Sequence, residues 1–219
     1  MLFEALESGL DSRRRRTVVS RARVIPANEY VRTRWKNGQG WTREILRVPD
    51  QDNWDWRLSI AEIEQDAAFS SFPGIDRELI LLQGNGVRLE FADGEPVELE
   101  PPHGRLRFAG EREVFGKLRD GTTHDFNLMW RREAVDAELL HRPLVGPMLF
   151  FVDADTTWVI HLLAGQAEFE ADAGLPPLFA GDTAVLPAQA ERRRFALQGG
   201  GELLAARITP VKPVGTANQ

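Results

Sequence analysis

The sequence contains no cysteine, which excludes disulfide bonds, thiolate metal sites and cysteine nucleophiles. Only four of its 219 residues are histidine, so little material exists for a histidine-rich metal centre. No apolar run approaches the roughly 18 residues that a membrane span needs. The first twenty residues also lack the apolar core and small-residue cleavage site of a secretory signal. We therefore expect a cytoplasmic protein with no membrane partner.

Several catalytic motifs are missing as well. The chain has no Gly-x-Ser-x-Gly elbow, no Gly-x-x-x-x-Gly-Lys phosphate loop and no Gly-x-Gly-x-x-Gly opening a helix. No amphipathic helix longer than about three turns stands out. What is present is the composition of an ordinary globular protein, with 42% hydrophobic and 27% charged residues.

Charge is spread unevenly over the chain. The net charge is −6, yet residues 11–47 hold eleven Lys/Arg against three Asp/Glu, a local charge of +8. We interpret residues 1–22, with the run Arg13 to Arg16, as a basic and flexible extension, and residues 213–219 as a C-terminal tail. A nucleic-acid contact of the arginine run is the weaker hypothesis, because no stacking aromatics interleave it. Nucleic acid is therefore not an expected partner.

Hydrophobic residues alternate with a period of two, which is typical of half-buried strands. Over residues 54–61 this places Trp54, Trp56, Leu58 and Ile60 on one face and Asp55, Arg57 and Ser59 on the other. Residues 78–83 and 87–91 are two further strands, and the Gly84-Asn85-Gly86 between them predicts a hairpin. Residues 134–141 fit a helix or a strand equally well.

A strand–Gly-turn–strand–Pro–strand unit occurs twice. Residues 158–165 resemble the segment ending at Gly84, displaced by 81 positions, and each copy later reaches a basic–aromatic strand, at 105–108 and 192–195. Two copies predict duplicated β-barrels. We expect an all-β fold with few short helices, with a first barrel over 23–130 and a second over 131–212, and strands can be exchanged between them.

The Leu-Leu-x-Gly pattern, and the Gly181-Asp182 turn before Leu186-Pro187, resemble the jelly-roll spacing of cupins. A metal-binding cupin carries two histidines one residue apart, a glutamate and a later histidine. Here no His-x-His exists, and His103, His124, His141 and His161 each stand alone in the sequence. We therefore predict no metal and no cofactor. The alternative is a metal held by Asp153, Asp155 and Glu191.

Four segments concentrate polar and cationic residues. They are Trp-Lys-Asn-Gly-x-Gly-x-Thr-x-Glu-Ile (35–45), Trp-Arg-x-Ser-x-Ala (56–61), Phe-Ser-x-Phe-Pro-Gly-x-Asp-Arg (69–77) and Asp-Phe-Asn-x-Met (125–129). In this order they resemble the HutD/Ves family of bicupins, from about Val24 to Ile208. The family often has Gly-Gly-Gly where this chain has Gly38-Gln39-Gly40.

The resemblance implies two cupin barrels without the metal histidines, and a small carboxylate of histidine catabolism, such as urocanate or formylglutamate, as the ligand. The candidate ligand-binding residues that it implies are Lys36, Asn37, Thr42, Glu44, Arg57, Ser59, Arg77, Asp125 and Asn127. Arginine suits such a ligand because its planar fork matches a carboxylate. The structural alternative is that Arg57–Glu44 and Arg77–Asp76 are ion pairs that hold strands in register.

We expect a regulatory or sequestering module that binds a small anionic metabolite, with no assigned catalytic residue. The alternative is a cofactor-independent lyase, isomerase or hydrolase that uses Glu44 or Asp125 as a base and Arg77 to stabilise negative charge. A carboxylate with a pKa raised by burial inside the cavity would favour the enzyme. Cupin sheets often pair through edge strands, so a homodimer is the expected assembly.

Overall fold

The computed structural model describes residues 21–212, and it confirms the all-β prediction. The Arg13 to Arg16 run, nearly all of the 1–22 extension and the 213–219 tail lie outside these residues. In the described part the helical pieces are two three-residue 3-10 turns, η1 (Ala27–Glu29) and η2 (Ala171–Ala173). No helix between residues 21 and 212 has the length and apolar character to cross a membrane.

The first barrel is made of two antiparallel sheets. The six-stranded sheet has the order β2-β3-β4-β11-β6-β9, and the four-stranded sheet has the order β5-β10-β7-β8. The strands of the larger sheet are β2 (Val31–Arg34), β3 (Gly40–Val48), β4 (Trp56–Ile63), β6 (Ile75–Gln83), β9 (Arg105–Ala109) and β11 (Thr123–Arg131). Those of the smaller sheet are β5 (Ala67–Ala68), β7 (Val87–Phe91), β8 (Val97–Leu99) and β10 (Val114–Leu118).

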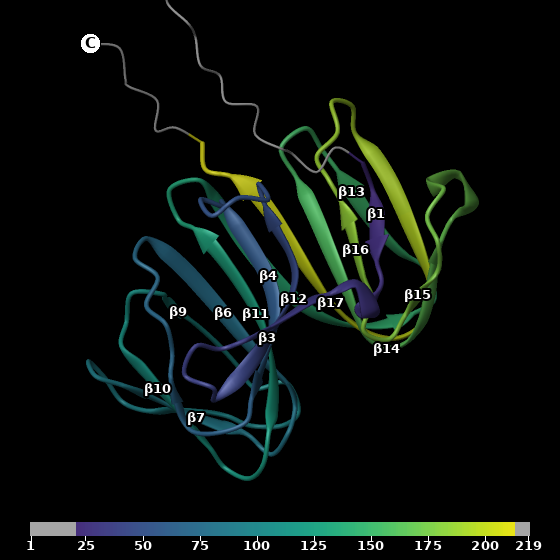
Figure 1. The fold of residues 1–219 in the computed structure, drawn as a ribbon. Helices are drawn as coiled ribbons and strands as arrows, with labels where there is room; N and C mark the ends of the chain where they lie inside the picture. Colours follow the sequence, from purple (N-terminus) through teal and green to yellow (C-terminus); the bar gives the residue numbers. More distant parts are fainter. Residues whose placement is uncertain (1–20, 213–219) are drawn as a thin grey trace, which may run out of the picture.

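The second barrel is a seven-stranded sheet in which β1-β16-β14-β17-β12 form the main path, while β13 joins β17 and β15 joins β14. Its strands are β1 (Arg23–Ile25), β12 (Val135–Val145), β13 (Met148–Val152), β14 (Thr157–Phe169), β15 (Leu178–Phe179), β16 (Thr183–Leu186) and β17 (Arg193–Pro210). Figure 1 shows purple β1 among the green and yellow strands of this barrel, because β1 pairs with β16. The described part of the chain thus joins the second barrel before it builds the first. In the ambiguous segment, residues 135–141 are strand.

The largest apolar cluster lies between the two barrels. Trp56, Leu58 and Ile60 from β4 and Phe126, Leu128 and Trp130 from β11 pack there with residues of β12, β14, β16 and β17. Period-two alternation therefore predicted the buried face of β4 correctly, and the same alternation holds on β11. Trp54 is the exception. It precedes the first residue of β4 and packs with Ile75 and Met129, because the alternation holds only inside the strand.

The predicted hairpin over 78–91 is wrong. β6 pairs with β9 and β11 in the larger sheet, whereas β7 pairs with β8 and β10 in the smaller one. Gly84-Asn85-Gly86 is therefore a crossing between sheets. The glycines are needed for backbone conformation and close approach, since Gly84 has φ +101° and a Cβ there would lie 2.6 Å from the Thr122 carbonyl oxygen.

This crossing gives a test of the fold. We expect Gly84→Ala to lower the free energy of unfolding by about 3 kcal/mol, because left-handed strain adds to a steric overlap. Gly121 offers a matched control, since it has φ +68° but no atom within 4 Å of an added Cβ. Gly121→Ala should cost only about 1 kcal/mol from strain. Denaturant titration of both variants measures the difference, and equal losses would contradict the close-approach argument.

Candidate functional site: a cationic cavity in the first barrel

Three neighbouring strands of the six-stranded sheet align polar side chains in rows. Met129 on β11 lies opposite Arg57 on β4 and Arg77 on β6. Two residues along, Asn127 lies opposite Ser59 and Leu79. Because alternate residues of a strand share a face, these side chains all point away from the inter-barrel core and into the first barrel. The sequence pattern that buries Phe126 and Leu128 thus directs their neighbours inward.

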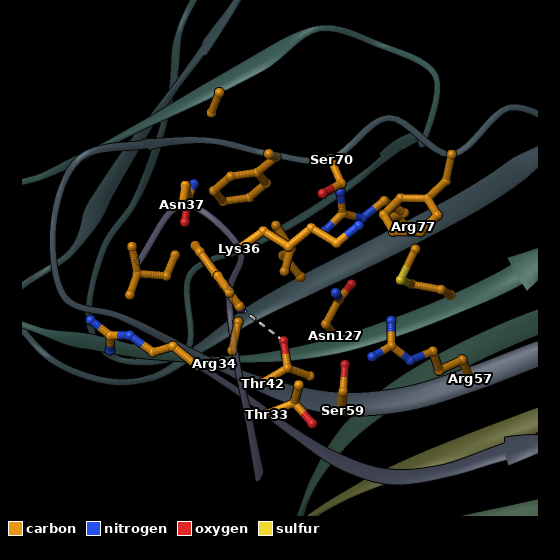
Figure 2. A pocket seen from close by; sticks show the side chains of 18 residues that line it. Thr33, Arg34, Lys36, Asn37, Thr42, Arg57, Ser59, Ser70, Arg77 and Asn127 are labelled. Carbon is orange, nitrogen blue, oxygen red and sulfur yellow. Dashed lines mark hydrogen bonds between the residues drawn. The ribbon is translucent and has the colours of Figure 1, made fainter. Parts of the chain in front are cut away.

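These rows form the floor of a cavity of about 490 Å³, within the usual size range of small-molecule sites. The loop that follows β2 and the segment around Phe69 contribute its other walls. In Figure 2, Lys36 and Arg77 approach the cavity from different elements, and Asn127 and Ser59 lie on the sheet below them. The lining residues are Thr33, Arg34, Trp35, Lys36, Asn37, Thr42, Arg57, Ser59, Ala61, Ile63, Ala68, Phe69, Ser70, Phe72, Arg77, Leu79, Asn127 and Met129.

The structure brings seven of the nine predicted site residues around this one cavity: Lys36, Asn37, Thr42, Arg57, Ser59, Arg77 and Asn127. Glu44 and Asp125 do not line it. The lining carries four cationic side chains and no carboxylate among the described residues. A positive, partly apolar hollow of this kind attracts anions.

Arg77 is the most unusual of the four cations. It is 6% exposed, and within residues 21–212 no carboxylate lies within ion-pair distance of it. Its guanidinium carbon lies 5.2 to 5.6 Å from the ring centres of Phe69, Phe72 and Phe108. Burial, and to a smaller extent repulsion by Arg57, lowers the pKa of Arg77 to about 10. A buried cation without a counter-ion destabilises the folded protein, and a bound anion would offset this penalty.

Arg57 differs because it has a partner. Its Nε donates to Glu44 Oε2 at 2.7 Å, and Glu44 also lies 3.6 Å from Arg47. The structural alternative is therefore correct for Arg57–Glu44. It is wrong for Arg77, because Asp76 pairs instead with Arg107 and Arg132 on the other side of β6. Alternation explains the outcome, since adjacent residues of a strand face opposite ways.

Two buried side-chain oxygen atoms on the cavity-facing side of β11 lack hydrogen-bond partners. Asn127 Oδ1 is buried and unpaired, although Asn127 lines the cavity. Asp125 is 1% exposed; its Oδ2 accepts a hydrogen bond from the Thr123 hydroxyl at 3.0 Å, while Oδ1 has no partner. Burial raises the pKa of Asp125 to about 7 against the opposing hydrogen bond. A buried amide oxygen without a partner at a cavity wall is a ready acceptor for a hydrogen-bond donor of a ligand.

The loop between β2 and β3 holds the cavity mouth in shape. Trp35 Nε1 donates to the Thr42 hydroxyl at 2.9 Å (Figure 2). Asn37 Oδ1 accepts from the backbone N–H of Gln39, and Asn37 Nδ2 donates to the Gln39 side chain at 2.8 Å. Asn37 thus stabilises its own turn. The glutamine that departs from the Gly-Gly-Gly pattern is its partner. Lys36, next to Asn37, lines the cavity.

Sequence reasoning missed the aromatic wall. Phe69 and Phe72 were not among the expected ligand-binding residues, yet both line the cavity beside Arg77. Arg34 was also missed; it lines the mouth and pairs with Glu64 at 2.6 Å. The Phe-Ser-x-Phe spacing was the available signal, since it accompanies Arg77 in the same motif.

The alternative metal site in the second barrel is not formed. In residues 21–212, Asp153, Asp155 and Glu191 do not gather as ligands, and Asp153 lies 3.4 Å from Arg192. The interior of the first barrel presents arginines, which repel cations.

The four histidines are isolated in the sequence, but not all of them are isolated in the structure. His161 is buried and structural, with its Nδ1 2.9 Å from Thr183 Oγ1, whereas the rings of His103 and His141 lie 4.5 Å apart.

The fold and the cavity define a bicupin, an all-β protein of two barrels, in which one barrel holds a cationic cavity. The chain belongs to the HutD family, which it matches over residues 27–205. It is 30% identical to HutD from Pseudomonas fluorescens SBW25 (formate condition), with a TM-score of 0.76 over 87% of this chain and 100% of that one. The predicted family and bicupin fold are thus confirmed.

Curated relatives match over shorter stretches. An uncharacterised 21.2 kDa protein in the hutC 3′ region of Pseudomonas putida is 41% identical over 55% of this chain and 64% of its own length. Protein Ves of Cronobacter sakazakii is 39% identical over 48% of this chain and 58% of its own length. The matched stretch therefore spans about three-fifths of these relatives.

Proposed function

We propose that this protein binds a small organic carboxylate in the first-barrel cavity and acts as a regulatory or sequestering module. The observation that carries the proposal is Arg77, a buried guanidinium without a counter-ion at the wall of a cavity that carries no acidic residue among its lining. A carboxylate that accepts hydrogen bonds from Arg77 would supply the missing negative charge. Lys36 Nζ and Asn127 Nδ2 are further donors on residues around the same space.

The cavity also favours a ligand with an apolar or planar part. Phe69 and Phe72 flank Arg77, and Leu79 and Met129 cover the sheet beside it. Aromatic walls bind flat conjugated groups well. Membership of the HutD family, together with the relative in the hutC 3′ region, supports a carboxylate of histidine catabolism, such as urocanate or formylglutamate.

Binding is favoured over catalysis by the positions of the two candidate bases. Glu44 accepts a hydrogen bond from Arg57 and Asp125 lies outside the lining, so neither contacts a ligand in the cavity. General-base catalysis needs the base within hydrogen-bond reach of the proton that it removes. The cofactor-independent lyase, isomerase or hydrolase is therefore the second proposal, and it rests on the raised pKa of Asp125.

Calorimetry of the untagged protein with urocanate, N-formylglutamate and formate tests the binding proposal. We expect at least one organic carboxylate to bind one-to-one, and its neutral amide to bind at least tenfold more weakly, because the amide lacks the charge that Arg77 needs. Equal affinity for acid and amide, or no binding of any carboxylate, would refute the proposal. Product analysis after prolonged incubation separates the two functions, since any turnover supports the enzyme.

A further inference from the structure

A second polar cluster lies outside the cavity, where the two barrels meet. His103 comes from the loop between β8 and β9 of the first barrel, whereas His141 on β12 and Glu202 on β17 come from the second. His141 pairs with Leu204 and Pro143 pairs with Glu202, so the two side chains are diagonal neighbours on one face of that sheet. Leu139 and Leu204, on the same face, belong to the inter-barrel core, which places the cluster at its rim.

The geometry converges on one point. His141 Nε2 lies 2.6 Å from Glu202 Oε1, and His103 Nε2 lies 3.3 Å from Glu202 Oε2. One ligand atom from each of the three residues lies within 4.8 Å of the other two. All three residues are half-buried, so the cluster is sheltered yet reachable from solvent. It is the one group of three or more histidines and acidic residues with metal-ligand spacing between residues 21 and 212.

The hydrogen bonds of His103 direct one ring nitrogen toward Glu202. His103 Nδ1 lies 3.3 Å from the Leu81 carbonyl oxygen. A carbonyl oxygen only accepts, so Nδ1 donates to it, and Nε2 is the nitrogen that faces Glu202. When the ring holds a single proton, Nε2 carries a lone pair, and a cation (a proton or a metal ion) between Nε2 and the carboxylate joins the two acceptors. A histidine whose other nitrogen donates to a backbone carbonyl is the usual arrangement at metal sites.

The backbone of His103 has a conformation that is unusual for a residue with a side chain. It is the single non-glycine residue with positive φ, +57°, in the described part of the chain. A left-handed backbone is unfavourable for a non-glycine residue and persists where the surrounding structure imposes it. Here it turns the ring toward His141 and Glu202.

We propose that His103, His141 and Glu202 bind one divalent transition-metal ion, which links the two barrels. Two imidazoles and one carboxylate suit Zn²⁺ and its neighbours, and three protein ligands leave a position open for water or another ligand. The site differs from the cavity in place and in charge, so it stands whether or not the carboxylate proposal holds. This proposal also departs from the expectation of no metal. That expectation rested on the cupin ligand pattern inside a barrel, in which two histidines are one residue apart in the sequence.

Titration of the untagged full chain with ZnCl₂, followed by calorimetry, tests this site. The absence of cysteine removes thiolate competition. We expect one Zn²⁺ per chain, a higher thermal unfolding midpoint with zinc, and at least tenfold weaker binding in His141→Ala and in Glu202→Gln. Co²⁺ should give d–d absorption bands that both variants lose. His124→Ala is the matched control, because His124 lies on β11 away from the cluster, and it should bind zinc like the wild type.

Three results would overturn the proposal: no stoichiometric binding, binding that both cluster variants retain, or binding that His124→Ala loses equally. Glu202→Gln keeps the shape and hydrogen-bonding capacity of the side chain, so it guards against a simple folding defect in His141→Ala. Circular dichroism of each variant without metal establishes that it is folded before zinc is added.

Discussion

Arg77→Met is expected to abolish carboxylate binding and, at the same time, to make the protein more stable. The guanidinium is buried among three phenylalanines and has no acidic partner. Methionine keeps much of the volume and removes the charge, so the desolvation penalty disappears from the folded state. We expect the free energy of unfolding to rise by about 1–3 kcal/mol without ligand, and affinity for the carboxylate to fall at least a hundredfold.

The opposite signs make this prediction sharp. An arginine kept for structure would lose stability on replacement, whereas an arginine kept for a ligand loses function and gains stability. Arg192→Met is the control, since Arg192 is exposed in the second barrel and its loss changes the net charge by the same amount. Calorimetry and thermal unfolding of both variants give the two readouts. Retained binding in Arg77→Met, with full heat signal, would remove Arg77 from the site.

The ordered motifs predicted much of this site, because the strand register brings inward-facing residues of separate motifs together. Arg57, Ser59, Arg77 and Asn127 occupy inward positions of three strands that lie side by side. Period-two alternation identified the opposite, buried face of β4. The resemblance to the HutD/Ves motifs implied the same four residues. Alternation gives the facing of a side chain but not whether it reaches the cavity. Asp125 faces the same way as Asn127, and Ala61 opposite it lines the cavity, yet Asp125 itself does not.

Other features depended on distances that no local pattern encodes. The Gly84-Asn85-Gly86 signal is the same for a hairpin and for a crossing between sheets, and only the pairing of β6 and β7 with other strands decides between them. His103 and His141 are 38 positions apart and meet because β12 packs beside the first barrel. β1 joins the second barrel although its neighbours in sequence build the first. Long-range packing, not propensity, determined each of these outcomes.

Asp125 is expected to make the free energy of unfolding fall as the pH rises, which is opposite to the effect of most carboxylates. Its pKa is about 7 in the folded protein because burial disfavours the charged form, against 3.8 for an ordinary aspartate. Between these two values the folded chain holds a proton that the unfolded chain has released. Stability contributed by this residue is therefore complete below about pH 4 and is lost as the pH rises toward 7.

Asp125→Asn should remove this loss, because the amide does not titrate and Thr123 can still donate to its oxygen. We expect the free energy of unfolding of the variant, relative to that of the wild type, to rise by on the order of 2–4 kcal/mol between pH 4 and pH 8. The slope of that difference with pH is the readout, so a constant offset from imperfect packing of the amide does not obscure it. Asp52→Asn, at an exposed position, should follow the wild-type profile. Denaturant unfolding across the pH range measures all three proteins. A difference between Asp125→Asn and wild type that stays flat with pH would mean that Asp125 ionises in the fold as readily as in water.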